Sequence, residues 1–380
     1  MRCALSIRKE AAGNLLDFSK GIAILLIAFH HFSRSLWLVR GVEPPTLLQW
    51  NFDPAGEGFG SLVSAATAGQ YSEVIFRLSA QFGYVGVHLF VLMSGLGLAL
   101  GTPKAVDTGS FLKRRFRKII PPFWTAVVFF VLLRIAIGEP YSVRQVVERM
   151  SLLTTFDQEQ FFRVDPPLWC LALFFQLYLI FLPLRRLIVR FGSRMLLPLT
   201  GIAFIARWAL SFPPIQHWNM YIDHVIALDW LVVFGLGIWI GGKLQSDGEV
   251  VLPAWTVTGT MLTATVLLFL SERFTSVYPI HDTAVGIVIG GITLLAWKAM
   301  PKLRLTGALA AVGSVSFPLY LYHRPLIGMA VLLWRESPQA ASVPPLGLGL
   351  ATVGTLVVVF LLVRLISHLN RGIVTLAFGI

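Results

Sequence analysis

The sequence contains few charged residues and few cysteines. Only 13% of its 380 residues are Asp, Glu, Lys or Arg, and 56% are hydrophobic, whereas a soluble globular domain has about 25% charged residues. This shortage of charge excludes a soluble enzyme. The two cysteines, Cys3 and Cys170, have neither CxxC nor zinc-ligand spacing, and no HExxH motif is present, so the sequence predicts no metal site.

Acidic residues are also scarce. Nineteen Asp and Glu stand against 31 Lys and Arg, which gives a net charge of +12. In a soluble protein such an excess would suggest a nucleic-acid partner. In a membrane protein it marks the cytoplasmic loops instead, so we expect contact with membrane lipids and no binding of nucleic acid.

Long apolar runs dominate the chain. Runs of about 18 or more apolar residues are typical of membrane-spanning helices, and helices satisfy their own backbone hydrogen bonds in lipid. The sequence therefore predicts an all-α, polytopic membrane helix bundle in one domain over residues 1–380, with about ten transmembrane helices. The ten segments cover residues 15–33, 82–101, 119–138, 166–184, 195–211, 222–242, 251–270, 282–300, 306–334 and 345–367.

The loops between these segments alternate in charge. The N-terminal segment 1–14 and every second connection are basic, while loop 139–165 holds five acidic residues against three basic ones. By the positive-inside rule both termini are cytoplasmic. Residues 34–81 and 139–165 are then expected to be extracytoplasmic loops.

Lys20 and His31 are eleven positions apart in the first apolar segment. At 3.6 residues per turn this spacing puts both side chains on one helix face, about 16 Å apart along the axis. Lys20 is thus expected at the inner interface and His31 deeper in the membrane. A neutral imidazole can act as a general base, although a histidine that only bonds a neighbouring helix would stabilise the bundle instead.

Further polar residues fall at similar depths. Ionisable or polar groups within a span are tolerated only when they face the bundle interior or a water-filled cavity. The sequence therefore predicts a polar chamber that reaches from the middle of the membrane to its outer face. Its expected members besides His31 are His88, Gln176, Tyr178, His323 and Arg324.

Five motifs resemble those of the acyltransferase-3 family, in the order of that family and over residues of about 15–367. "LLDFSKGIAILLIAFHHF" resembles its opening helix, in which a basic residue, ten intervening residues and a histidine form the signature, with Lys20 in place of the commoner arginine. Phe174 and Phe175 depart from the family, because many members have glutamates there. The other similar stretches are "GVHLFVLMSGLGL", "FLKRRFRKIIPPFW", "LWCLALFFQLYLIF" and "VGSVSFPLYLYHRPLI".

This resemblance implies an O-acyltransferase of the bacterial inner membrane. Members move an acyl group, usually acetyl from acetyl-CoA, onto a hydroxyl, and their acceptors include envelope and exopolysaccharide glycans. We expect a lipid-linked repeat unit as the acceptor, and other polysaccharide-assembly proteins as partners.

The expected roles follow from chemistry and position. His31 is the predicted general base, and His88, Tyr178 and His323 orient it or bond the developing oxyanion. The predicted donor-binding residues are Lys20, Arg114, Arg115 and Lys118. The predicted acceptor-binding residues are Gln176, Arg324 and Trp218. Each group also has a purely structural explanation. The basic cluster would set the membrane topology of a cytoplasmic loop, Lys20 would anchor its helix at the interface, and Trp218 would belong to an interfacial aromatic belt.

Two other functions are compatible with buried histidines. A polytopic transporter or glycan flippase would use them as a proton relay, but the inverted repeats and broken helices of such transporters are not evident in the sequence. A non-catalytic membrane subunit of a polysaccharide machine is the third alternative, and the paired Lys20 and His31 argue against it.

Overall fold

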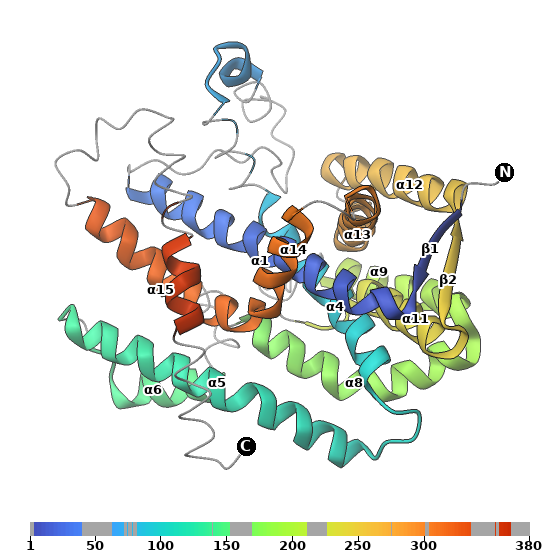
Figure 1. The fold of residues 1–380 in the computed structure, drawn as a ribbon, viewed down its shortest axis with the longest axis horizontal. Helices are drawn as coiled ribbons and strands as arrows, with labels where there is room; N and C mark the ends of the chain where they lie inside the picture. The colour runs from blue at the N-terminus through green and yellow to red at the C-terminus, as the bar shows by residue number, and fades with distance from the viewer. Residues whose placement is uncertain are drawn as a thin grey trace.

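The structure is a computed structural model of the full chain, and helices account for most of it (Figure 1). It describes residues 4–39, 63–71, 74, 78, 82–138, 140–152, 169–210, 226–274, 276–300, 304–335, 354 and 357–365. The prediction of a helical membrane bundle is confirmed, whereas its ten spans and the side of each terminus stay predictions.

The helices of the described residues begin and end as follows: α1 (Lys9–Val39), α4 (Val85–Gly101), α5 (Thr108–Ala136), α6 (Val143–Met150), α8 (Trp169–Phe191), α9 (Leu196–Leu210), α11 (Leu231–Asp247), α12 (Ala254–Arg273), α13 (His281–Ala299), α14 (Arg304–Ser314) and α15 (Ser316–Arg335). Two 3₁₀ turns, η3 (Gly192–Met195) and η5 (Tyr278–Ile280), precede α9 and α13. Within the described residues, five helical stretches are long and apolar enough to cross a membrane, or six if α14 and α15 count as one.

A two-stranded ribbon adds β structure to the predicted all-α fold. Strand β1 (Ala4–Arg8) pairs antiparallel with β2 (Glu249–Pro253), and Ile7 and Val250 are its buried side chains. Gly248, with a φ of +77°, makes the turn from α11 into β2. Part of the segment expected as a cytoplasmic N-terminal tail is therefore a strand that anchors the start of α1 beside the end of α11.

Helix α1 lies at the centre of the bundle, where it packs against α4, α14 and α15, and α4 packs in turn against α11 (Figure 1). Glycines make the closest of these approaches. A side chain at Gly237 of α11 would meet the Leu92 carbonyl of α4, and one at Gly95 of α4 would meet the Phe234 carbonyl of α11. Small residues are what allow helix backbones to approach so closely in a membrane.

Replacing Gly313 with alanine is expected to destabilise the contact between α1 and α14. A methyl group there would collide with the backbone carbonyl of Asp17, so the two helices must separate, at a cost of about 1–3 kcal/mol. Gly307, on the same helix, is the matched control, because nothing lies within 4 Å of its added methyl group. Unfolding of both variants in detergent tests this; equal stability of the two would contradict it.

The predicted span 306–334 is not one straight helix. Helices α14 and α15 meet at Val315 with a bend of 78°. Glycine and serine pairs and proline are the usual causes of sharp kinks, and Gly313, Ser314 and Ser316 flank the bend with Pro318 in the next turn. The bend directs α15 along α1 and brings His323 and Arg324 beside His31.

The predicted basic loop before residue 119 is instead the first part of α5. Asp107 begins this helix by accepting a hydrogen bond of 2.8 Å from the backbone N–H of Ser110. That bond holds the pKa of the Asp107 carboxyl below its usual value. Lysine and arginine are good helix formers, so a basic stretch marks the membrane boundary without marking the end of a helix.

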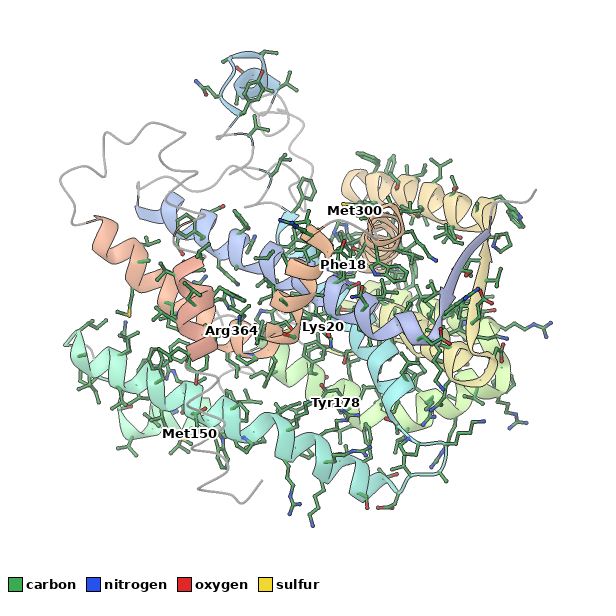
Figure 2. All side chains as sticks on the ribbon, viewed as in Figure 1. Phe18, Lys20, Met150, Tyr178, Met300 and Arg364 are labelled. Carbon is green, nitrogen blue, oxygen red and sulfur yellow. The ribbon has the colours of Figure 1, made fainter. Side chains whose placement is uncertain are left out.

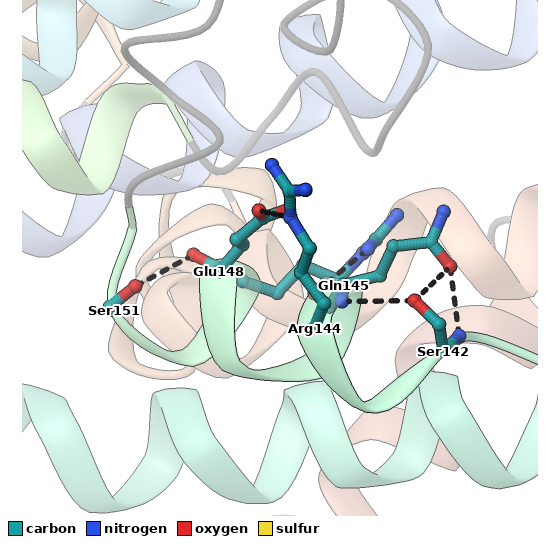
Figure 3. A network of polar contacts seen from close by, with 6 residues as sticks. Ser142, Arg144, Gln145, Glu148 and Ser151 are labelled. Carbon is teal, nitrogen blue, oxygen red and sulfur yellow. Dashed lines mark hydrogen bonds and ion pairs between the residues drawn. The ribbon is translucent and has the colours of Figure 1, made fainter.

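The described part of the predicted loop 139–165 contains α6. Its first turn has a capping box, in which the Ser142 hydroxyl accepts from the Gln145 backbone N–H at 3.3 Å and the Gln145 side chain accepts from the Ser142 N–H at 2.9 Å (Figure 3). Arg144 and Glu148 form an ion pair one turn apart, at 2.6 Å. Trp124 of α5 donates to the Met150 carbonyl at 3.0 Å, so α6 is a folded element that lies along α5.

Candidate active site

Three of the predicted site residues lie together where α1 meets α15. The Arg324 guanidinium donates to His31 Nδ1 at 2.8 Å, and the His31 and His323 rings are 5.2 Å apart between centroids. His30 lies beside them, with its ring edge-on to that of His31. Since His31 and Arg324 are almost 300 positions apart in sequence, the fold and not local spacing creates this cluster.

The hydrogen bonds assign the tautomers of the two imidazoles. A guanidinium can only donate, so His31 Nδ1 is the acceptor and a neutral His31 carries its proton on Nε2. His323 has the opposite arrangement, because its Nδ1 lies 2.8 Å from the Tyr320 carbonyl and 3.1 Å from that of Leu319. His323 is fully buried, and its Nε2 has no hydrogen-bond partner in the described part of the chain.

An apolar cavity of about 240 Å³ adjoins His323. Among the described residues that line it, His323 is the only titratable one, and the others come from α1, α14, α15 and the helical segment 357–365. These other lining residues are Ile24, Leu25, Ala28, Phe29, Val312, Leu319, Val357, Val359 and Phe360. The cavity offers room for an aliphatic chain beside the histidine pair.

The predicted donor-binding residues form a second cluster on α1 and α5. Lys118 is close enough to Arg115 and Lys20 to interact with both electrostatically. Arg115 is half-buried, with its guanidinium over the Phe111 ring at 5.3 Å. Lys20 forms a weak ion pair with Asp17 at 3.4 Å. The structure thus brings Lys20 near the basic stretch that precedes the proline pair of α5, and the role of these residues in donor binding stays a prediction.

Tyr178 belongs with this cationic cluster. Its hydroxyl lies near Ser94 of α4 and within electrostatic range of Arg115. Figure 2 labels both Lys20 and Tyr178 in the central part of the molecule. The contacts of Tyr178 therefore suit a role beside the donor, whereas its predicted bond to an oxyanion near His31 stays a prediction.

The remaining predicted residues are placed as follows. Arg114 is exposed on α5. The Gln176 amide is used within the fold, since it accepts from the Ala227 N–H at 3.2 Å and donates to the Ala172 carbonyl at 3.3 Å. Trp218 lies outside the described residues. The roles of these three in binding stay predictions.

His88 belongs to a buried polar network that the sequence reasoning did not foresee. Its Nε2 lies 2.9 Å from Asp282 Oδ1, and Asp282 is also paired with Arg207 at 2.8 Å. Arg207 further contacts Asp229 at 3.6 Å. All four side chains are almost inaccessible to solvent. The sequence did contain a signal for this network, namely ionisable residues within apolar runs. Arg207 lies in the predicted span 195–211, and Asp282 is the first residue of the predicted span 282–300.

The rest of this network surrounds His281. Its Nε2 is 3.1 Å from the Tyr84 hydroxyl and its Nδ1 is 3.1 Å from the Ser271 hydroxyl, so a neutral ring donates to one hydroxyl and accepts from the other. Helices α4, α9, α12 and α13 contribute to this network, with Asp229 just before α11. The network joins these helices across the interior, and it supports α4, which packs directly against α1.

One of three comparisons with known proteins finds a match. No curated protein and no solved structure matches the chain. The family described as an acyltransferase domain matches residues 14–364. That range includes Lys20 and His31 on α1, the basic stretch of α5, and the α15 residues that contact His31. The chain therefore belongs to the acyltransferase-3 family and is a membrane acyltransferase.

Proposed function

We propose that this acyltransferase moves an acetyl group from acetyl-CoA to a hydroxyl of an envelope or exopolysaccharide glycan in the bacterial inner membrane. One observation carries the proposal. Helix α1 joins the two clusters, with Lys20 beside Lys118 and His31 beside Arg324 and His323. Lys20 and His31 are eleven positions apart, which corresponds to about 16 Å of helix, a separation that an extended pantetheine arm can bridge.

In this proposal the cationic cluster holds the donor. Acetyl-CoA has its phosphates at the nucleotide end, and arginine and lysine are the side chains that bind phosphate best. Arg115, Lys118 and Lys20 gather without a matching number of acidic partners, since Asp17 is the single carboxylate paired with Lys20 in the described residues. A polyanion would relieve the repulsion among them.

His31 is the proposed general base, and Arg324 controls its availability. The lone pair of Nδ1 is occupied while Arg324 donates to it. When the guanidinium turns to the thioester carbonyl, it stabilises the developing oxyanion and frees Nδ1. Nδ1 then takes the proton of the acceptor hydroxyl as the oxygen attacks the carbonyl carbon. The carbon–sulfur bond breaks, and the thiolate of CoA leaves and receives that proton.

Replacing Lys20 with alanine is expected to weaken binding of acetyl-CoA and to leave binding of the acceptor nearly unchanged. Loss of one charge-assisted contact to phosphate corresponds to about a tenfold higher KM for the donor. Lys113→Ala is the matched control, because Lys113 is exposed on α5 and has no role in the proposal. Steady-state KM values for both substrates test this, and a selective rise for the acceptor would reassign Lys20.

Transfer of radiolabel tests the function itself. Purified protein in nanodiscs is incubated with acetyl-CoA labelled in the acetyl group and with glycan acceptors, and labelled ester is then counted. Ester formation that depends on the protein supports the proposal. Movement of glycan across proteoliposomes without any ester formation would favour the transporter or flippase instead.

A further inference from the structure

A second cationic site lies away from the donor cluster. A cavity of about 640 Å³ is enclosed by α8, α11 and the segment between α4 and α5. It shares no lining residue with the cluster of Lys20, Arg115 and Lys118. Its cationic lining residues are Lys104, Arg185, Arg186, Arg190 and Lys243.

Arg185 gives this cavity a fixed wall. The side chain is only 7% exposed, and its guanidinium donates at 2.8 Å both to the Pro103 carbonyl and to Gln245 Oε1. The Gln245 amide donates in turn to the Thr102 carbonyl at 3.3 Å. These bonds join α8, α11 and the end of α4, so the hollow is part of the folded structure and not a gap between mobile side chains.

The positive charge of the cavity is mostly uncompensated. Lys243 pairs with Asp247 at 2.8 Å. No carboxylate of the described residues is paired with Lys104, Arg186 or Arg190. Like charges that converge on a hollow raise the local concentration of anions. The positive-inside rule puts this end of α8 at the cytoplasmic surface, where basic pockets between helices bind doubly charged lipid headgroups.

Part of the lining of the cavity is apolar. It includes Ile188 and Val189 of α8 and Ile238 and Trp239 of α11, and Val189 is 70% exposed. A ligand that suits both the cationic and the apolar lining residues has an anionic head and a hydrocarbon tail. The charges of Lys104, Arg186 and Arg190 together exceed the single charge of an ordinary phosphodiester headgroup, so two phosphates match the site better than one.

We propose that this cavity binds a lipid whose headgroup carries two phosphates, with its hydrocarbon chains along the α8 and α11 wall. Two kinds of lipid have this chemistry. One is a resident phospholipid of the cardiolipin type, and the other is an isoprenoid diphosphate that carries a glycan. The site is distinct from the acyl donor site, so it holds whether or not the donor is acetyl-CoA.

Native mass spectrometry of the detergent-purified protein tests the proposal. Titrations use cardiolipin, an isoprenoid diphosphate, phosphatidylglycerol and phosphatidylcholine. The double variant Arg186→Gln/Arg190→Gln is compared with Lys113→Gln/Arg117→Gln, which removes two exposed cations of α5. At about 1 kcal/mol for each basic residue near a lipid headgroup, the first pair is expected to weaken binding of a two-phosphate lipid about 30-fold, and the control pair to leave it unchanged.

The results of these titrations distinguish the two kinds of lipid. Selective loss of cardiolipin binding identifies a resident phospholipid, and selective loss of isoprenoid diphosphate binding identifies a glycan carrier. Equal binding of all four lipids, or equal binding by both double variants, overturns the proposal. So does a loss of CoA binding in Arg186→Gln/Arg190→Gln with lipid binding intact, since the cavity would then hold the nucleotide of the donor. Thermal unfolding confirms that the compared variants are folded.

Discussion

Replacing His31 with alanine is expected to reduce the rate of acyl transfer by about 10²–10⁴-fold, the contribution typical of a positioned general base. The protein is expected to stay folded and inserted, because His31 is half-buried at the edge of the α1–α15 contact and not within the core. Initial rates with saturating acetyl-CoA measure the effect. The KM for the donor is expected to stay near its original value, since Lys20 and its neighbours are unchanged.

His30→Ala is the matched control for this substitution. It removes an imidazole from the adjacent position, whose ring lies 5.2 Å from that of His31, but it leaves the bond between Arg324 and His31 in place. We expect its rate to fall by less than about threefold. Full activity of His31→Ala, or an equal loss in both variants, would show that the proton is removed elsewhere. His323 would then be the next base to test, since its Nε2 lone pair is buried and available.

Replacing Arg207 with methionine is expected to produce the largest loss of stability, about 3–5 kcal/mol, because removing one member of a buried ion pair leaves the other charged. Here two carboxylates, Asp229 and Asp282, would both be left without their shared cation. Arg207 also lies over the Tyr278 ring at 5.0 Å, so packing is lost as well. Denaturation in mixed micelles measures the change in the free energy of unfolding.

The double variant Arg207→Met/Asp282→Asn separates charge from packing. It removes one of the stranded carboxylates, so it is expected to recover part of the loss, which gives a coupling energy of about 1–3 kcal/mol. Arg194, an exposed residue of η3, provides the control, and Arg194→Met is expected to change stability by less than about 0.5 kcal/mol. An Arg207→Met protein as stable as the original would mean that the network contributes nothing to the fold.

The sequence predicted the arrangement along single helices well. The eleven-residue spacing correctly assigned Lys20 and His31 to one continuous helix, because side-chain position along a helix follows directly from sequence separation. The sequence predicted the ends of helices less well. The first apolar run ends at residue 33, yet α1 extends from Lys9 to Val39. Hydropathy reports where lipid begins, and helical hydrogen bonding continues beyond that boundary into polar sequence.

The contacts between distant helices could not be predicted from the sequence alone. Estimated depth placed His88 near His31, but depth does not fix the direction in which a side chain points. In the structure His88 is paired with Asp282, which follows it by 194 positions. The contact of Arg324 with His31 likewise depends on the 78° bend between α14 and α15. Both are consequences of the packing of several helices.

The most direct test of the account is a structure with a non-hydrolysable analogue of acetyl-CoA bound. We predict that its phosphates contact Arg115, Lys118 and Lys20, that its acyl carbonyl lies within about 3–3.5 Å of an atom of the His31 and Arg324 pair, and that Arg324 has left His31 Nδ1. An analogue bound with its nucleotide between Arg186 and Arg190, or with its acyl group remote from His31, would contradict the account.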